Sequence, residues 1–483
     1  MQRNTSSALD IYLIGICGTG VGSLAGLLKQ QGHRVRGSDE QVYPPMSDKL
    51  RQWGIPILEG FDAAHLDPAP DIVVVGNVIR AVNPEATAAR ERGLETLSMP
   101  EAVGRFGIGD MHAIVVAGTH GKTSITALTA HVLVSAGRDP SFLVGGALVG
   151  YPESFRSSRL KHGGFFVVEG DEYDTAYFDK GPKFLHYRPR TAILTSLELD
   201  HVDIFESIED VEAAFGALIG KVPSHGHLVV WHGAERARRL IAAHARTSRV
   251  TVYSEEPADG ADLWLDGFSS SPEGLSFEPI ERSTSLGEMH VPLWGAFSAR
   301  NVLAVVAALR EVGLSPDELR DGLAGYEGVK RRLEVRGEPG GITVVDDFGH
   351  HPTAVTLTLA AARTRWPDRT MWAVFEPRSA TTRRNVFQQA FTDAFAAADR
   401  VVIGSHERLA EIPEAERFDP SAVATALVER GVPAAAIVEV DRIVDHVAAE
   451  ARPGDVVMIF SNGAFGGLHT KLLERLAVSE NEA

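Results

Sequence analysis

The sequence contains one cysteine, no long apolar run and no excess of basic residues. Cys17 is the only cysteine among 483 residues, so no disulfide can form within the chain, as is usual in a reducing compartment. No apolar run approaches the roughly 18 residues of a membrane-spanning helix. Lysine and arginine total 47 against 64 acidic residues, and this net charge of −17 disfavours general binding of nucleic acids or anionic membranes. We therefore expect a cytoplasmic protein, with no nucleic-acid or membrane partner, that holds any anionic ligand at a local site.

Glycine is abundant, with 47 residues, and apolar runs alternate with helical patterns along the chain. This alternation predicts an α/β protein with parallel sheets, and the length is typical of about three domains. The first domain opens with an expected strand at 11–15, a glycine cluster, an expected helix at 23–31 and a second strand that ends at Ser38 and Asp39. An acidic side chain at such a strand end can accept hydrogen bonds from a ribose or a base. We therefore predict a nucleotide-type domain at the N-terminus.

The segment VVAGTHGKTS, residues 115–124, has the composition of a phosphate-binding loop. Backbone N–H groups freed by Gly118 and Gly121 can point at phosphate oxygens, Lys122 adds a positive charge, and a hydroxyl of Thr123 or Ser124 can reach a magnesium ion. The usual P-loop pattern would have a glycine where this chain has valine, five positions before Gly121. The alternative is a glycine turn with a surface lysine.

Acidic and imidazole side chains follow the next two apolar strands of the central region. The segment FFVVEGDEYD carries Glu169, Asp171, Glu172 and Asp174, and LELDHVD carries Asp200, His201 and Asp203. Because the carboxyl ends of parallel strands share one edge of a sheet, Lys122, Glu169 and His201 are expected to project toward one metal-nucleotide site. The alternatives are a solvated acidic loop and a structural histidine.

The last third of the chain repeats the strand-helix pattern after a stretch at 250–293 that predicts antiparallel strands or an insertion. We place the boundaries so that the domains are residues 1–108, 109–333 and 334–483. In the third domain, VVDDFGHHP places two aspartates and two histidines in a turn. Zinc is disfavoured there because no cysteine joins them and the spacing is not that of a closed site. Arg378 and Ser379 form a basic turn that can grip a carboxylate, or else a solvated turn.

The segments GTHGKTS, EGDEYD, LELDHVD, ARN, GVKRRLE and DDFGHHP occur in the order and spacing of the Mur ligases, and the chain resembles that family from end to end. The resemblance implies a three-domain α/β architecture with a Rossmann-like N-terminal domain, a P-loop central ATPase domain and a Rossmann-like C-terminal domain. It also implies an ATP-dependent ligase that forms amide bonds in peptidoglycan synthesis, with Mg²⁺ as cofactor and ATP as co-substrate.

The GICGTG opening is similar to that of the branch of this family that binds UDP-N-acetylmuramate. Four stretches, at 37–47, 76–84, 142–151 and 374–387, resemble the members that attach the free peptide L-Ala-γ-D-Glu-meso-diaminopimelate during peptidoglycan recycling. The alternative within the family is ligation of free L-alanine. The sequence carries no signal for the oligomeric state.

The resemblance implies a role for residues in each domain. The UDP-sugar would contact Gly18, Thr19, Gly20, Ser38, Asp39 and Asn77. The nucleotide would contact Gly118, Thr119, His120, Gly121, Lys122, Thr123, Ser124, Asn301, Arg332 and Asp347. The peptide would contact His350, Arg378 and Ser379. Lys122, Glu169 and His201 would be catalytic, and Thr123, Glu169 and His201 would hold the metal.

Two positions depart from the family pattern. Arg300 stands where a histidine commonly precedes Asn301, and no lysine lies between LELDHVD and Lys221, so the carbamylated lysine of some relatives is absent. The resemblance further implies an acyl-phosphate mechanism, with His201 or a neighbouring carboxylate as the base and hinges near 104–111 and 328–336. Two alternatives come from other classes. A nicotinamide oxidoreductase is disfavoured because Ser23 stands where strict GxGxxG needs its last glycine, and a nucleotide-driven switch would need neither other substrate.

Overall fold

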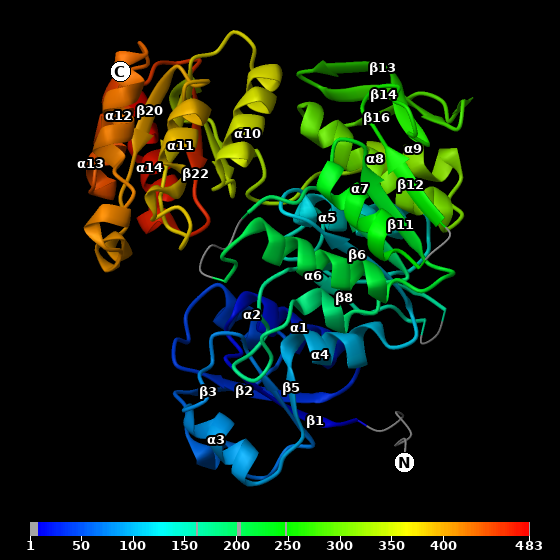
Figure 1. Ribbon diagram of the computed structural model, residues 1–483. Coiled ribbons are helices and arrows are strands. Elements are labelled where there is room, and N and C mark those ends of the chain that lie inside the picture. Colours follow the sequence, from blue (N-terminus) through cyan, green and yellow to red (C-terminus); the bar gives the residue numbers. More distant parts are fainter. Residues whose placement is uncertain (1–7, 161–162, 200–203, 247–248, 483) are drawn as a thin grey trace.

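A computed structural model describes residues 8–160, 163–199, 204–246 and 249–482. The described chain forms three α/β units that follow one another along the sequence, each built on its own sheet (Figure 1). This confirms the predicted fold class. His201, with Asp200 and Asp203, lies outside the described residues.

The first unit is a five-stranded parallel sheet in the order β3-β2-β1-β4-β5. Its strands are β1 (Asp10–Ile14), β2 (Arg34–Asp39), β3 (Ile57–Glu59), β4 (Ile72–Val75) and β5 (Thr96–Ser98). Its helices are α1 (Thr19–Gln30), α2 (Met46–Gln52) and α3 (Pro84–Glu91). Helix α1 begins four residues before the predicted start, because Gly18 caps it directly and Gly20 and Gly22 continue the helix instead of a loop.

The second unit is an eleven-stranded sheet in which β12-β11-β10-β6-β9-β7 run parallel, and β12 also pairs parallel with β13 (Leu263–Ser271). These strands are β6 (His112–Ala117), β7 (Ser141–Leu143), β9 (Phe165–Gly170), β10 (Thr191–Leu194), β11 (His227–Trp231) and β12 (Arg249–Tyr253). Strand β8 (Phe155–Arg156) pairs antiparallel with β7. The predicted antiparallel stretch is confirmed as β13 (Leu263–Ser271), β14 (Gly274–Glu281), β15 (Thr284–Ser285) and β16 (Met289–Val291).

Helices cover both faces of this second sheet. They are α5 (Lys122–Ser135), α6 (Ile208–Lys221), α7 (Glu235–His244), α8 (Ala296–Glu311) and α9 (Pro316–Ala324). Helix α4 (Met99–Ala102), which a π-helical turn at Val103–Ile108 extends, packs instead against β4, β5 and α1 of the first unit. Helix α9 begins with a capping box, in which the Ser315 hydroxyl accepts from the Glu318 N–H and the Glu318 carboxylate accepts from the Ser315 N–H.

The third unit is a six-stranded sheet in the order β17-β18-β22-β19-β20-β21, parallel except for β17 at its edge. Its strands are β17 (Glu334–Gly337), β18 (Thr343–Asp347), β19 (Met371–Phe375), β20 (Arg400–Ile403), β21 (Ala434–Ala436) and β22 (Val456–Phe460). Its helices are α10 (Pro352–Arg365), α11 (Gln388–Phe395), α12 (Pro420–Glu429), α13 (Val440–Glu450) and α14 (Leu468–Glu482).

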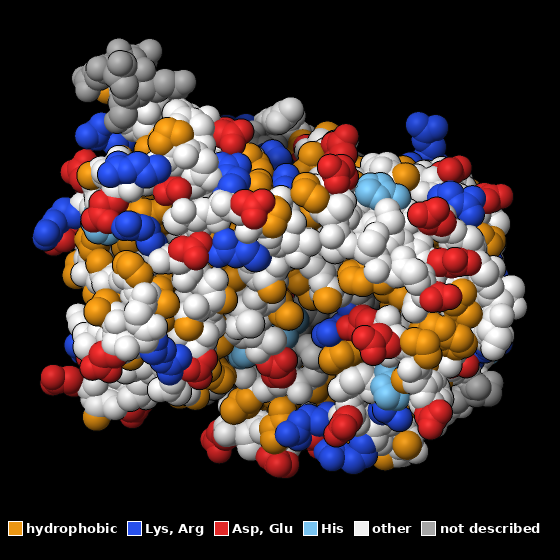
Figure 2. All heavy atoms as spheres, turned by 90° about the horizontal axis from the view of Figure 1, so that it is seen from above, with side chains coloured by type: hydrophobic (Ala, Val, Ile, Leu, Met, Phe, Trp, Pro, Cys, Tyr) orange, Lys and Arg blue, Asp and Glu red, His pale blue; other side chains and the backbone are white. Residues whose placement is uncertain are grey.

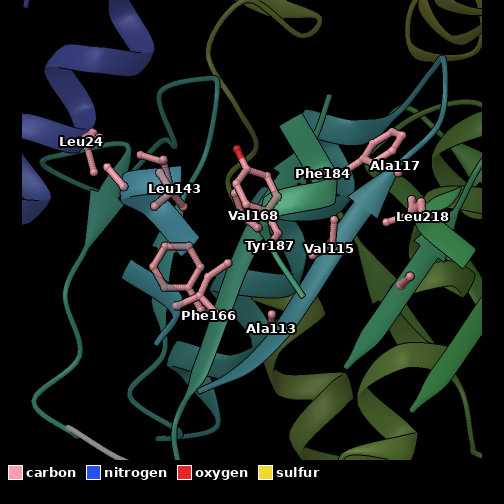
Figure 3. Close-up of a cluster of buried hydrophobic side chains, with 14 of the residues drawn as sticks. Leu24, Ala113, Val115, Ala117, Leu143, Phe166, Val168, Phe184, Tyr187 and Leu218 are labelled. Carbon is pink, nitrogen blue, oxygen red and sulfur yellow. The ribbon is translucent and has the colours of Figure 1, made fainter. Parts of the chain in front are cut away.

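One hydrophobic core is shared by the first two units. Leu24 of α1 lies beside Leu143 of β7, and both join the cluster that contains Phe166 of β9 and Phe184 (Figure 3). The third unit has clusters of its own, centred on buried residues such as Phe375 and Trp372. The first two units are therefore packed as one body of apolar contacts, whereas the third has a separate interior.

The chain crosses into the third unit between Lys330 and Arg331. The Lys330 N–H donates to Ala147 of the second unit, whereas the Arg331 carbonyl accepts from Phe348 N–H of the third. This crossing lies within three residues of the predicted boundary at 333/334. The exact limits of the domains stay a prediction.

The surface seen from above the second and third units carries interspersed acidic and basic side chains, without a broad basic field (Figure 2). Among the described residues, no helix combines the length and the apolar character needed to cross a membrane.

Candidate functional site

The phosphate-binding loop follows β6 and is shaped by two glycines. Gly118 has φ +133°, and a Cβ at this position would lie 2.0 Å from the Thr195 hydroxyl oxygen. Gly121 has φ +80°, and a Cβ there would lie 2.8 Å from Asn301 Oδ1. Both positions therefore need glycine, for space as well as for backbone conformation. Helix α5 begins directly after Gly121, which has no side chain to cap it, so the helix N-terminus is open to an anion.

Lys122 is held inside a ring of oxygen atoms at the start of α5. Its Nζ donates to the Gly118 carbonyl at 2.8 Å and lies 3.0 Å from Glu172 Oε2, and the two side chains are 13% and 6% exposed. Burial disfavours the charged lysine, but the carboxylates of Glu172 and Asp171 outweigh it and raise the lysine pKa. The ammonium is therefore charged and pre-positioned beside the loop.

Glu169 and Thr123, which are predicted to bind a metal ion, lie against each other. The Thr123 hydroxyl donates to Glu169 Oε2 at 2.9 Å, and the Gly145 N–H donates to Glu169 Oε1 at 2.5 Å. Burial, with a smaller contribution from the Asp171 charge, raises the pKa of Glu169. A buried carboxylate whose charge is disfavoured in this way, with a hydroxyl beside it, suits a divalent cation that would neutralise it. The third predicted ligand, His201, lies outside the described residues.

The other predicted nucleotide residues of the second unit surround the same loop. The Thr119 hydroxyl donates to the Ser196 carbonyl at 3.2 Å, and the His120 carbonyl accepts from the Thr195 hydroxyl at 2.7 Å. Ser124 continues the first turn of α5. Asn301, on α8, is buried against Gly121. The structure thus brings the described second-unit residues of the prediction to one sheet edge.

Arg300 directly precedes Asn301 on α8, and the sequence did not predict its contacts. Its guanidinium lies 3.5 Å from the centre of the Trp231 ring and its Nε donates to Glu255 at 2.5 Å. The Trp231 indole N–H donates to the same carboxylate at 2.6 Å. The departure of Arg300 from the family pattern was the available signal.

The predicted residues of the third unit cluster at the carboxyl end of β18 and β19. Asp347 accepts the Leu333 N–H at 2.9 Å and the Gly349 N–H at 2.7 Å, so both of its oxygens brace the turn. Burial raises the pKa of Asp347, against the opposing charge of Arg332. Arg332 lies 5.3 Å from the centre of the Phe348 ring, and His350 Nδ1 lies 3.0 Å from the Phe348 carbonyl.

The predicted carboxylate-binding turn after β19 packs against the loop that follows β22. The guanidinium of Arg378 lies over Gly463, where a Cβ would come within 2.0 Å of its Nη1. The Ser379 hydroxyl hydrogen-bonds Thr382. Arg378 and Ser379 therefore stand in one ordered turn, and their contact with a substrate stays a prediction.

The predicted UDP-sugar residues lie around the ends of β1, β2 and β4. Gly18, Thr19 and Gly20 begin α1, and Asp39 Oδ2 accepts the Cys17 N–H at 2.9 Å. Asn77 is exposed just after β4, which pairs with β1. Ser38 differs from the others: it is fully buried, and its hydroxyl donates to the buried Glu85 at 2.5 Å. The structure therefore gives the Ser38 side chain a partner within the fold.

Glu198 is a site residue that sequence reasoning missed. Its Oε2 lies 3.3 Å from His120 Nε2, 3.9 Å from His351 Nδ1 and 3.0 Å from the Thr353 hydroxyl, and thus links the phosphate loop to the third unit. The nearest ligand atoms of His120, Glu198 and His351 lie within 4.8 Å of one another, a donor set that a metal ion accepts. Glu198 is the first acidic residue after β10, and this position was the signal in the sequence.

Comparison with known proteins matches all three units to models of one family. The matches are to the catalytic domain of the Mur ligase family at residues 10–109, the Mur ligase middle domain at 116–309 and the Mur ligase glutamate ligase domain at 331–463. The UDP-N-acetylmuramate--L-alanyl-gamma-D-glutamyl-meso-2,6-diaminoheptandioate ligase of Escherichia coli (strain K12) is 38% identical over 97% of this chain and 98% of its own. The chain belongs to the Mur ligase family.

A further sequence relative and a solved structure are also similar to this chain over nearly its whole length. The UDP-N-acetylmuramate--L-alanine ligase of Desulfitobacterium hafniense (strain Y51) is 32% identical over 94% of this chain and 97% of its own. The crystal structure of a murein peptide ligase from Psychrobacter arcticus 273-4 is similar with a TM-score of 0.72 and 34% identity, covering 97% of this chain and 99% of that one. This Mur ligase is accordingly an ATP-dependent, amide-forming enzyme with the three-domain architecture of its family.

Proposed function

We propose that this Mur ligase joins the lactyl carboxylate of UDP-N-acetylmuramate to the free amine of L-Ala-γ-D-Glu-meso-diaminopimelate, with cleavage of ATP to ADP and phosphate. The observation that carries the proposal is the 38% identity to the E. coli ligase named for this tripeptide, against 32% to a ligase named for L-alanine. We place this reaction in peptidoglycan recycling. A cytoplasmic location is part of the same proposal.

The geometry of the second unit supports the nucleotide half of this reaction. The open N-terminus of α5 and the Lys122 ammonium together form a cationic cradle beside Gly118 and Gly121. Such a cradle stabilises charge on the phosphoryl group that is transferred. Asn301, packed on Gly121, is placed to contact the nucleotide, and we assign Arg332 and Asp347 to it from the third unit.

Mg²⁺ fits the pair formed by Thr123 and Glu169, with His201 as the further ligand assigned by family resemblance. A bound magnesium ion would screen phosphate charge as the lactyl carboxylate attacks the γ-phosphorus. The buried Glu169 carboxylate, whose pKa is raised mainly by desolvation, supplies the negative charge that such a cation needs.

The reaction follows from the poor reactivity of a carboxylate as an acyl donor. Attack of the lactyl carboxylate on ATP forms an acyl phosphate and releases ADP. The peptide amine then attacks the acyl carbon, and the tetrahedral intermediate collapses to the amide with loss of phosphate. A base removes the proton from the attacking amine; His201 and the carboxylate of Glu198 are the candidates, and Glu198 lies 3.3 Å from the loop residue His120. Closure of the third unit would exclude water from the acyl phosphate.

A substrate panel tests the proposal. Phosphate release is measured with UDP-N-acetylmuramate and ATP, and with L-alanine, the tripeptide or the corresponding tetrapeptide as acceptor, and the amide product is identified by mass spectrometry. We expect efficient turnover with the tripeptide and little with L-alanine. Exclusive use of L-alanine would overturn the proposal in favour of the other branch, and phosphate release unaffected by both other substrates would indicate a nucleotide-driven switch.

A further inference from the structure

A pocket of about 300 Å³ lies between the second and third units, beside the phosphate loop. The residues that line it from the second unit include Glu198, Leu199, Ile208 and Arg236, and those from the third unit are His351 and Phe387. Its volume is at the lower end of the range for small-molecule sites, and exceeds what one small amino acid requires. Because both units contribute walls, an occupant would be held only when they are together.

The end of the pocket near the phosphate loop is acidic. The Glu198 backbone N–H donates to the Thr119 hydroxyl at 2.8 Å, so this residue is tied to the loop itself. Its Oε2 lies 3.3 Å from His120 Nε2 and 3.0 Å from the Thr353 hydroxyl, at the border of the two units. A carboxylate tied to the phosphate loop in this way is a partner for an ammonium group.

Arg236 gives the same pocket a basic element. It is the second residue of α7, and its Nη1 lies 3.1 Å from Glu212 Oε1. Arg239 pairs with the same oxygen at 2.6 Å. The Glu212 carboxylate therefore pairs with two guanidinium groups, so Arg236, Arg239 and Glu212 together carry a net positive charge. The positive end of the α7 dipole lies beside Arg236 and increases the positive potential there.

Apolar side chains form the walls of the pocket between its acidic end and Arg236. Leu199 and Ile208 face the pocket from the second unit. On the other side, the Phe387 ring lies edge-on to His351 at 4.9 Å between centroids. Such walls suit the aliphatic part of an extended ligand that carries an amine at one end and a carboxylate at the other.

We propose that this pocket receives the incoming peptide, with its amine end toward Glu198 and a carboxylate of its distal residue on Arg236, which makes Arg236 a specificity-determining residue. The inference rests on the proposed function, since it deepens that site. Free L-alanine carries its only carboxylate one carbon from its amine, so it cannot use the second contact.

The test compares Arg236→Gln with Arg239→Gln, since both arginines pair with Glu212 and only Arg236 lines the pocket. Steady-state kinetics are measured with the tripeptide and with a tripeptide whose distal carboxylates are amidated. Loss of one charged hydrogen bond predicts a roughly 10- to 100-fold rise in the KM of the tripeptide for Arg236→Gln. The KM values of ATP and UDP-N-acetylmuramate should not move, and Arg239→Gln should behave as wild type.

The amidated peptide separates a contact with substrate from a structural effect. Wild type should lose affinity for it by a similar factor, whereas Arg236→Gln should be indifferent to amidation. The inference is overturned if both variants raise the KM equally, if neither does, or if Arg236→Gln still discriminates against the amidated peptide. If wild type turns over the tripeptide and any of these three results is found, only the pocket assignment is overturned and the proposed function stands. Wild type that uses only L-alanine overturns both the assignment and the proposed function.

Discussion

At the scale of single residues, two histidines, one buried (His227) and one half-buried (His112), pair with threonine hydroxyls on the central sheet. His112 Nε2 lies 2.8 Å from the Thr191 hydroxyl, and His227 Nε2 lies 2.8 Å from the Thr251 hydroxyl, across β6, β10, β11 and β12. Burial lowers the pKa of each histidine to about 4 from 6.5. Both are therefore neutral in the folded protein near pH 7.

These histidines predict a loss of stability in mild acid. Protons bind the unfolded chain first as the pH falls below 6.5, so the loss grows until the folded pKa near 4 is reached. Each histidine should lower the free energy of unfolding by roughly 2 kcal/mol between pH 7 and pH 5. We expect His227→Gln, which cannot titrate, to remove that part of the pH dependence in denaturant unfolding. His225→Gln changes an exposed histidine and should leave the dependence intact; equal behaviour of the two variants would contradict the assignment.

At the scale of elements, the turn from β6 to α5 combines a catalytic and a structural role in Lys122. The lysine opens the helix, and it also neutralises the buried Glu172. Removal of one member of a buried pair leaves a charge uncompensated, which destabilises the fold independently of catalysis. A substitution of Lys122 alone would therefore change both turnover and stability.

Lys122→Ala should reduce kcat by at least about 100-fold, because the transferred phosphoryl group loses its cationic partner. The double variant Lys122→Ala with Glu172→Gln removes the uncompensated charge and should recover thermal stability without recovering turnover. Lys180→Ala, at an exposed lysine paired with Asp174, is the control and should retain activity. Substantial turnover in the stable double variant would refute the role of Lys122.

At the scale of the whole molecule, the two junctions between units differ in how they are held. The first is braced by residues 153–157: Phe155 packs so closely on α1 that a Cβ on Gly26 would lie 2.1 Å from its ring. The Trp53 ring meets Phe155 edge-on at 4.9 Å, and its indole N–H donates to Glu153 at 2.8 Å. The predicted hinge near 104–111 lies beside this packed interface, so we expect motion mainly at the second junction, near Lys330.

Phe155→Ala should loosen the first junction. A buried phenylalanine replaced by alanine costs about 3–5 kcal/mol, and here that loss falls on contacts between units. We expect faster proteolysis near 103–111 and a higher KM for UDP-N-acetylmuramate, with the KM of ATP little changed. Phe268→Ala, at a phenylalanine 42% exposed on β13, is the matched control. Unchanged proteolysis in Phe155→Ala would show that the junction is held by other contacts.

The sequence by itself determined the three α/β units, the phosphate loop and the family, because these depend on local patterns: strand-helix periodicity, glycine positions and motifs within ten residues. It also placed Lys122, Thr123 and Glu169 correctly beside one another, since parallel strands bring their carboxyl ends to one edge. It did not find the short strands β3, β5, β7 and β8, whose two or three residues give no readable period.

Only the tertiary structure decided which side chains form hydrogen bonds within the fold and which meet across units. Ser38 and Asp347 face buried partners, and nothing in their local sequence specifies Glu85 or the Leu333 N–H. Glu198 and His351 are separated by more than 150 residues and become neighbours because the third unit packs against the second. Such contacts depend on how whole units pack against each other. That packing depends on many residues across both surfaces, and no single motif specifies it.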